Sequence, residues 1–314
     1  MNKQNGGLLI ITAGSNYLDI DAYACIVATA ELLNLQGVNA VAYSNAACNY
    51  SVCALLVLEG QVLCKLPVNV SEETARYIIV DVSDPEVLKN SVPLDRVCGV
   101  YDHHVGYERY WNEKLGCDAH IEFIGAAATL IYREWKKFGV VDQMKRSTAK
   151  LLIAAILDNT LNLISSNTTH EDIEVFRVLC TYAGVGDDFR ASYFSEVQKS
   201  VEEGLKNALF GDIKTLRNNP LLPSIISQLC VWNSEGILTR IDEIRTWFAP
   251  LRESWMINII DLSENCSYFV CDNEINQEKI ARVFDIRFEM GISKTKEPYL
   301  RKQIIKKLYC VSNF

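Results

Sequence analysis

Short apolar runs alternate with helical segments along the first half of this 314-residue chain. The runs that have the composition of buried strands are residues 8–12, 38–43, 77–80 and 97–101. The segments with helical character are residues 22–35, a short stretch that begins at Asp84-Pro85, residues 125–138 and residues 148–157. Continuous apolar strands connected by helices are typical of a parallel sheet that is covered on both faces. The sequence therefore predicts an α/β fold with a parallel-sheet domain, which we place at residues 1–185.

The pattern changes in the second half of the chain, after a break at residues 184–191. The elements predicted there are a long helix at 193–210, strands at 224–232 and 255–270, and helices near 242–247 and 277–283. We therefore expect a second, smaller α/β domain with a mixed sheet at residues 192–314.

The composition excludes several classes of protein. The chain carries 31 Lys and Arg against 39 Asp and Glu, for a net charge of −8, and is thus a poor partner for duplex DNA or an anionic membrane. Its apolar runs fall far short of the ~20 residues that span a bilayer, and its first residues do not resemble a secretory signal. Its 11 cysteines form no Cys-x-x-Cys pair, which indicates reduced thiols. We expect a cytoplasmic protein and leave a homodimer open.

Acidic and imidazole side chains lie mostly where the predicted strands end. The set consists of Asp19, Asp21, Asp81, Asp102, His103, His104 and Asp158. Because ligands of parallel sheets bind beyond the carboxyl ends of the strands, we expect most of these side chains to converge at one edge. Five carboxylates cannot all stay ionised in one cleft without compensating positive charge. An oxygen-rich set with an imidazole suits Mg²⁺ or Mn²⁺ better than zinc, so the sequence predicts a divalent-cation site.

A structural role, such as capping a helix, is the alternative to metal binding for these carboxylates, and its strength differs between them. Asp19 and Asp21 precede a helix and could simply cap it. Capping does not explain Asp81, because Asp84 already lies at the N-cap position of the next helix. Asp158 follows seven apolar residues, where a buried carboxylate needs a partner, and a metal is one candidate.

The four histidines differ in what they predict. His103 and His104 would point to opposite sides of an extended strand, so we expect them to have different roles. His120 and His170 lie outside the strand-end set, and we interpret both as ordinary structural or surface residues.

The order of these motifs resembles that of the DHH phosphoesterase superfamily. The superfamily's Asp-x-Asp loop, strand-end Asp, Asp-His-His and later Asp are matched by Asp19 with Asp21, Asp81, Asp102-His103-His104 and Asp158. The stretches at 124–135 and 167–172 also resemble those that accompany the third and fourth motifs. The match covers residues 7–175 and implies a Rossmann-like catalytic domain.

The second half resembles the C-terminal domain of family II inorganic pyrophosphatases, exopolyphosphatases and prune proteins. Asp212 and Lys214 match an Asp-x-Lys element at its start. Arg301 and Lys302 match the Ser-Arg-Lys-x-Gln element at its end, in which Leu300 replaces the Ser. This resemblance implies a domain that binds the phosphate groups of the substrate.

The resemblance also implies a mechanism. Two divalent cations, Mg²⁺ or Mn²⁺, would be held by Asp19, Asp21, Asp81, His103 and Asp158. They would activate water for attack on a terminal phosphorus of inorganic polyphosphate or pyrophosphate. His104 would contact the substrate or its leaving group, and Asp102 would orient an imidazole. Arg301 and Lys302 would bind phosphate oxygens, with Lys199 as a weaker candidate.

Departures from the family pattern leave alternatives open. Ser15 stands where the pyrophosphatases carry a motif-one His, so one metal would see only oxygen donors, and we expect a weaker preference for Mn²⁺. Arg301 and Lys302 could instead lie on the solvated face of an amphipathic helix whose apolar face holds residues 304, 305 and 308. A phosphodiesterase of short or cyclic nucleotides and a non-catalytic relative that binds a phosphorylated ligand or a protein are the alternative functions.

Overall fold

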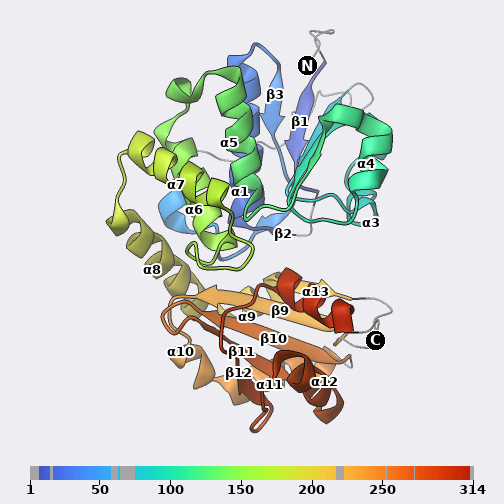
Figure 1. Ribbon diagram of the computed structural model, residues 1–314, viewed down its shortest axis with the longest axis vertical. Coiled ribbons are helices and arrows are strands. Elements are labelled where there is room, and N and C mark those ends of the chain that lie inside the picture. The colour runs from blue at the N-terminus through green and yellow to red at the C-terminus, as the bar shows by residue number, and fades with distance from the viewer. Residues whose placement is uncertain are drawn as a thin grey trace. The chain divides into compact units, whose positions relative to one another are not determined.

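The structure is a computed structural model, and it describes residues 7–14, 17–57, 63, 75–216, 223–251, 253–271 and 273–311. The contacts within the chain divide it into two compact units, Met1–Tyr193 and Phe194–Phe314. Each unit has its own five-stranded sheet with helices packed against it (Figure 1). The α/β class predicted from the sequence is confirmed, whereas the domain limits at 1–185 and 192–314 stay predictions.

The first unit is built on a parallel sheet with the order β3-β1-β5-β6-β7. Its strands are β1 (Leu9–Thr12), β3 (Ala40–Ala42), β5 (Arg76–Val80), β6 (Val97–Asp102) and β7 (Ala119–Ile121). The four predicted strands are present, and β7 is an addition at the sheet edge, too short to give a clear apolar run. A separate pair is formed by β2 (Tyr17–Leu18) and β4 (Ala47–Cys48).

Helices cover both faces of this sheet, as the apolar strands predicted. The helices described in this unit are α1 (Ile20–Leu35), α2 (Ala54–Val57), α3 (Pro85–Leu88), α4 (Glu108–Leu115), α5 (Ala127–Phe138), α6 (Arg146–Asn159) and α7 (His170–Ala183). Figure 1 shows α3 and α4 on one side of the sheet and α1 and α5 on the other. Trp111 of α4 is fully buried in one core cluster with Ile10 and Ile79. The strand residues therefore pack against α4 on this face.

Local capping decides where several of these helices begin. The Asp84 side chain accepts a hydrogen bond from the Glu86 N–H, and Pro85 is the first residue of α3, which confirms the predicted cap. Helix α1 begins two residues before its predicted start because the Asp19 carboxylate accepts from the Ala22 N–H at 2.9 Å.

The second unit has a mixed sheet with the order β12-β11-β10-β9-β8, in which β9 and β10 pair in parallel and the other described neighbours pair antiparallel. Its strands are β8 (Ile213–Thr215), β9 (Ile225–Val231), β10 (Trp255–Asp261), β11 (Cys266–Cys271) and β12 (Ile292–Lys294). The prediction of one strand over 255–270 is wrong, because β10 and β11 form an antiparallel hairpin. Asn265 completes its turn with a φ of +53°, a conformation that Asn adopts more readily than most residues.

The helices of the second half are α8 (Asp187–Glu203), α9 (Leu205–Gly211), α10 (Glu235–Leu238), α11 (Ile241–Phe248), α12 (Glu274–Phe284) and α13 (Arg301–Val311). The single helix predicted over 193–210 is wrong. It is interrupted at Gly204, which is the N-cap of α9, and Gly is a weak helix former. Helix α8 also begins at Asp187, so the predicted break at 184–191 is shorter than expected.

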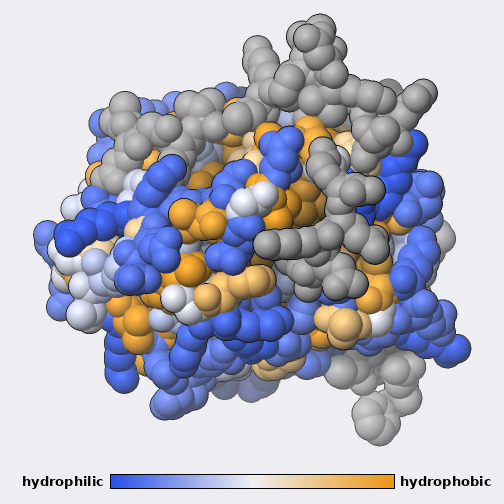
Figure 2. Space-filling view, turned by 90° about the horizontal axis from the view of Figure 1, so that it is seen from above, coloured by the Kyte–Doolittle hydropathy of each residue, from blue (hydrophilic) through white to orange (hydrophobic). Residues whose placement is uncertain are grey.

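The described part of the chain contains no helix long and apolar enough to cross a membrane. Figure 2 shows hydrophilic residues over much of the face seen from above, with hydrophobic residues gathered toward its middle. Apolar residues contribute to the surface of every folded protein, so this pattern by itself assigns no partner.

Candidate metal centre

Asp81 is placed by the end of strand β5. Its N–H donates to the Tyr101 carbonyl of β6 at 2.8 Å, and its φ of +58° lies in the left-handed region. Side chains rarely adopt this conformation, although Asp and Asn do so more often than most. The side chain is buried. A buried carboxylate on a strained backbone at a strand end is an arrangement that clusters at functional sites.

His103 follows strand β6 and turns its ring into the interior. Its Nδ1 lies 2.9 Å from the Gly125 carbonyl oxygen, and because a carbonyl can only accept, Nδ1 must carry the proton. The other ring nitrogen, Nε2, lies 3.3 Å from Asp81 Oδ1 and 3.9 Å from Asp21 Oδ2. Nε2 is therefore the ring nitrogen that faces the carboxylates and could bind a cation.

Asp21 lies fully buried in the first turn of α1. Its two oxygens accept from the backbone N–H groups of Ala127 and Ala128, each at 2.8 Å. The capping alternative therefore holds for Asp21, but the capped helix is α5 and not α1. Each carboxylate oxygen has two lone pairs, so these hydrogen bonds leave a role as a metal ligand open.

Asp102 binds the second imidazole of the pair. Its Oδ1 accepts from His104 Nδ1 at 2.8 Å and from the backbone N–H groups of His103 and His104. Burial alone would raise the pKa of Asp102, but the charge and hydrogen bonds of His104, together with a hydrogen bond from Ser83, hold the pKa below its ordinary value. With Nδ1 bound to Asp102, the ring presents Nε2 on its other side. The His104 side chain is 45% exposed, whereas His103 is buried, so the neighbouring rings have different surroundings.

These side chains form one concentrated group of ligand atoms. Asp81, His103 and His104 each offer an atom within 4.8 Å of the others. The negative charge nearby acts on Cys25 of α1: burial raises the pKa of this thiol well above its ordinary value, and Asp21, Asp81 and Asp19 raise it further. Carboxylate oxygens and an imidazole nitrogen facing one another across less than 4 Å fit a divalent cation, which would offset their charge.

The two remaining predicted ligands lie at helix ends. Asp19 is the half-buried N-cap of α1. Asp158 lies near the C-terminus of α6, where its Oδ1 accepts from the Tyr193 hydroxyl at 2.9 Å. The Tyr193 hydroxyl is thus a hydrogen-bond partner of the kind that we expected for Asp158. The role of Asp158 as a metal ligand stays a prediction. Ser15 lies outside the described residues.

Comparison with known proteins agrees with this geometry. No family model matches the chain. It is 27% identical over 179 residues to a protein of Bacillus licheniformis named a probable manganese-dependent inorganic pyrophosphatase, covering 57% of each chain. A Bacillus mycoides protein of the same name is 26% identical over 197 residues, which are 61% of this chain and 60% of that protein. The chain therefore matches less than two thirds of the length of these relatives.

The fold has a counterpart along nearly the whole chain. A solved structure from Methanococcus jannaschii, assigned to the family II inorganic pyrophosphatases, superposes with a TM-score of 0.71 and 18% identity over 98% of this chain and 99% of that one. The chain is thus similar in sequence to manganese-dependent pyrophosphatases and in fold to a family II inorganic pyrophosphatase, as its resemblance to the DHH phosphoesterase superfamily predicted. The sequence resemblance is thereby confirmed, and the Asp-His-His motif of the superfamily is the one that ends β6.

Two residues that support this DHH centre lie in stretches that the motif comparison covered, but it gave neither of them a role. Gly125 supplies the carbonyl that fixes the His103 ring, and Asp172 accepts from the Gly125 N–H at 2.9 Å. The available signal was the Thr169-x-x-Asp172 spacing, which predicts a capping box, and the structure contains that box at the start of α7. The spacing predicts the cap of α7 but not the contact with Gly125.

The histidines outside the motif occupy structural positions. His120 stacks on Tyr101 with ring centroids 4.6 Å apart, and His170 is the first residue of α7. Both agree with the structural interpretation of these residues.

In the second unit, Arg301 is tied to the Asp-x-Lys element. Its Nη1 donates to the Asp212 carbonyl and its Nη2 to Asp212 Oδ1, both at 2.7 Å. The Arg301 side chain is only 12% exposed, so the alternative of a solvated position is wrong for Arg301. Lys302 is half-buried at the start of α13, and Lys199 is exposed on α8.

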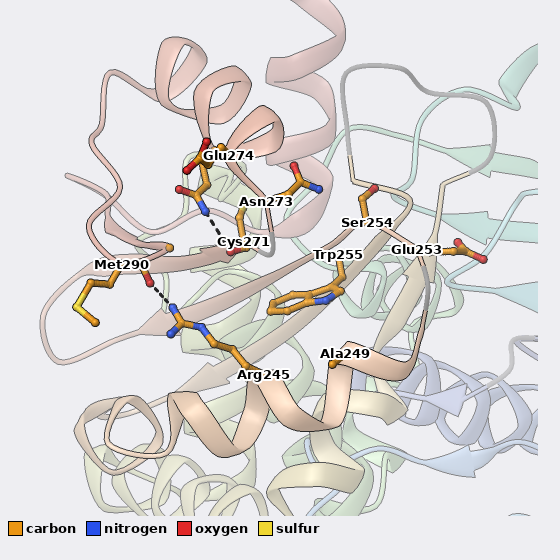
Figure 3. Close-up of a pocket in the computed structure, with 11 residues that line it drawn as sticks. Arg245, Ala249, Glu253, Ser254, Trp255, Cys271, Asn273, Glu274 and Met290 are labelled. Atoms are coloured by element: carbon orange, nitrogen blue, oxygen red, sulfur yellow. Dashed lines mark hydrogen bonds between the residues drawn. The ribbon is translucent and has the colours of Figure 1, made fainter.

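The second unit also contains a cavity of about 970 Å³ at the edge of its sheet (Figure 3). Arg245 reaches toward the Met290 carbonyl and donates a hydrogen bond to it, and Glu253 and Glu274 also line the space. One cation against two carboxylates makes the described lining acidic, which opposes the binding of a polyphosphate anion. Among the described residues, the group of side chains that could hold a compensating cation is that of Asp81, His103 and His104 in the DHH centre. The cavity is therefore a poorer candidate for the phosphate site than the DHH centre.

Proposed function

We propose that the chain is a metal-dependent phosphohydrolase that releases phosphate from pyrophosphate or inorganic polyphosphate. The observation that carries the proposal is the buried group of ligand atoms of Asp81 and His103, with His104 beside it, at the carboxyl edge of the parallel sheet. Relatives named as manganese-dependent pyrophosphatases support both the metal and the substrate. Because the chain matches only part of their length, its own activity requires direct assay.

The proposed metal ligands are Asp19, Asp21, Asp81, His103 and Asp158, which would together hold two divalent cations, Mg²⁺ or Mn²⁺. Bound divalent cations activate water and neutralise the charge of phosphoryl oxygens. The fixed tautomer of His103 keeps its Nε2 directed at Asp81, so this residue requires no reorientation when a cation binds.

His104 is the proposed substrate-contacting group. Its Nδ1–H is engaged by Asp102, so His104 would have to be in its doubly protonated imidazolium form for Nε2 to donate a hydrogen bond to a phosphate oxygen or a proton to the leaving group. Asp102 acts in this proposal through His104, because it holds the orientation and the tautomer of that ring.

Arg301 and Lys302 are proposed to bind phosphate groups, and Lys199 is the weaker candidate. Lys302→Ala should raise the KM for pyrophosphate by about tenfold or more, since a hydrogen bond to a charged group contributes about 1.5–3 kcal/mol. Steady-state kinetics provide the measurement, and Lys199→Ala should raise the KM less than Lys302→Ala because Lys199 is the weaker candidate, with an exposed side chain. An unchanged KM in Lys302→Ala would remove Lys302 from the substrate site.

Metal removal tests the proposed function itself. The full chain is stripped with a chelator, and phosphate release from pyrophosphate, polyphosphate and a dinucleotide is measured with no metal, Mg²⁺ or Mn²⁺. We expect release from pyrophosphate or polyphosphate only when a metal is added, with Mg²⁺ effective because Ser15 replaces an imidazole donor.

Three outcomes would oppose this account. Release in the metal-free chain would contradict the metal requirement, and cleavage of the dinucleotide alone would contradict the substrate class. A strict requirement for Mn²⁺ would contradict the expectation drawn from Ser15. The cytoplasmic location and the lack of duplex nucleic-acid and membrane partners stay predictions from the sequence, and a homodimer stays open.

A further inference from the structure

The N-terminus of α5 is held by two buried carboxylates. An α-helix leaves its first N–H groups without partners inside the helix. Here the N–H groups of Ala127 and Ala128 donate to Asp21, and those of Gly125 and Ala126 donate to Asp172 at 2.9 and 3.4 Å. Two acidic side chains from α1 and α7 thus bind four consecutive backbone groups at the start of α5.

Asp172 is fixed more firmly than a cap alone requires. It is fully buried and also accepts from the Thr129 hydroxyl at 2.6 Å and from the Thr169 N–H and hydroxyl, each at 2.7 Å. Five donors therefore converge on one carboxylate. A carboxylate bound by this many donors cannot rotate without breaking buried hydrogen bonds, each of which is costly to lose.

Gly125 is hydrogen-bonded both to Asp172 and to His103 of the metal centre. Its N–H is bound by Asp172, and its carbonyl oxygen accepts from His103 Nδ1 at 2.9 Å. The approach is so close that a Cβ on Gly125 would lie 2.5 Å from Asp172 Oδ2. The position of the carbonyl that sets the His103 tautomer therefore depends on Asp172.

We propose that Asp172 is a positioning residue for the metal ligand His103. By holding Gly125, it places the carbonyl that keeps the proton on His103 Nδ1 and leaves Nε2 directed at Asp81. His104 is held in place differently, by its direct hydrogen bond to Asp102. Each imidazole of the DHH motif thus has its own carboxylate. This inference rests on the proposed function only in that it takes the bound group to be a divalent cation.

The test compares Asp172→Asn with Glu31→Gln in the full chain. Asn replaces one accepting oxygen by an NH₂ group that opposes the donors around it. Glu31 is the matched control, because its carboxylate receives the Lys145 N–H and the Thr148 hydroxyl at the start of α6, a capping role without a contact to His103. Denaturant unfolding of both variants reports the general loss of stability.

Two readouts separate positioning from stability. Calorimetric titration with Mn²⁺ should show an affinity about 10–100-fold lower in Asp172→Asn, the usual cost of losing an outer partner of a metal ligand, and unchanged in Glu31→Gln. Nitrogen NMR of the metal-free chain, at a pH where the spectrum shows that the His103 ring is neutral, should show the Nδ1–H tautomer of His103 in the wild type and a mixture of tautomers in Asp172→Asn.

A milder variant decides the matter if Asp172→Asn does not fold. Thr129→Val removes one donor to Asp172 and keeps the carboxylate, and it should produce smaller changes in the same two readouts. Wild-type Mn²⁺ affinity and a wild-type His103 tautomer in a folded variant would overturn the proposal. The NMR readout needs neither metal nor turnover, so it judges the role of Asp172 even if the chain hydrolyses no phosphate anhydride.

Discussion

Asp81→Asn should weaken Mn²⁺ binding and slow phosphate release by at least about 100-fold. Losing an outer partner of a metal ligand already costs about 10–100-fold, and Asp81 lies in the ligand group itself, 3.3 Å from His103 Nε2. Asn tolerates the φ of +58° at this position as well as Asp does. The substitution therefore removes the charge with little change to the backbone. Mn²⁺ titration and initial rates of phosphate release measure the effect.

Asp84→Asn is the control for Asp81→Asn, because it makes the same chemical change three residues away. Asp84 caps α3, and Asn caps a helix about as well as Asp, so metal affinity and rate should stay at wild-type values. The metal-free Asp81→Asn chain should be at least as stable as the wild type, because one of several neighbouring negative charges has been removed. Equal metal affinity in the two variants would exclude Asp81 from the site.

Gly125→Ala should lower the free energy of unfolding by about 2–6 kcal/mol. The added Cβ would lie 2.5 Å from Asp172 Oδ2 and 2.7 Å from Thr160 Cγ2, and Asp172 is held by five donors. Overpacking a buried site costs about 1–3 kcal/mol, and breaking buried hydrogen bonds adds about 1–3 kcal/mol. Denaturant unfolding of the metal-free chain gives the value.

Gly211→Ala serves as the comparison for Gly125→Ala. Gly211 is the last residue of α9, and a Cβ there would meet no described atom within 4 Å. Its stability should change by no more than about 1 kcal/mol, and a gain is expected because Ala is the better helix former. A Gly125→Ala chain as stable as Gly211→Ala would show that Asp172 and Thr160 can move aside.

Local sequence patterns predicted the parts of the fold that local forces determine. The four apolar strands of the first sheet and the cap of α3 at Asp84 lie where periodicity and capping rules place them. The same rules failed where a turn was hidden in an apolar stretch. The run at 255–270 contains a hairpin because residues 262–265 turn the chain, and the helix predicted over 193–210 is interrupted at Gly204.

The site was predictable in its residues but not in its supporting contacts. Strand ends placed Asp81 and the DHH motif at one edge of the sheet, and the structure brings Asp81 and His103 to within 3.3 Å. The contact of Asp21 with α5 spans 106 positions of sequence, and that of Asp172 with Gly125 spans 47. Such contacts depend on tertiary packing and leave no periodic or motif signal in the chain.

The most direct test of the metal centre is whether His103 supplies a nitrogen ligand. Electron spin echo spectroscopy of the Mn²⁺-loaded chain detects an imidazole nitrogen bound to the ion, and it can be recorded for the wild type, His103→Gln and His104→Gln. The account predicts a nitrogen signal in the wild type and in His104→Gln, and its loss in His103→Gln. A signal that persists in His103→Gln would contradict it.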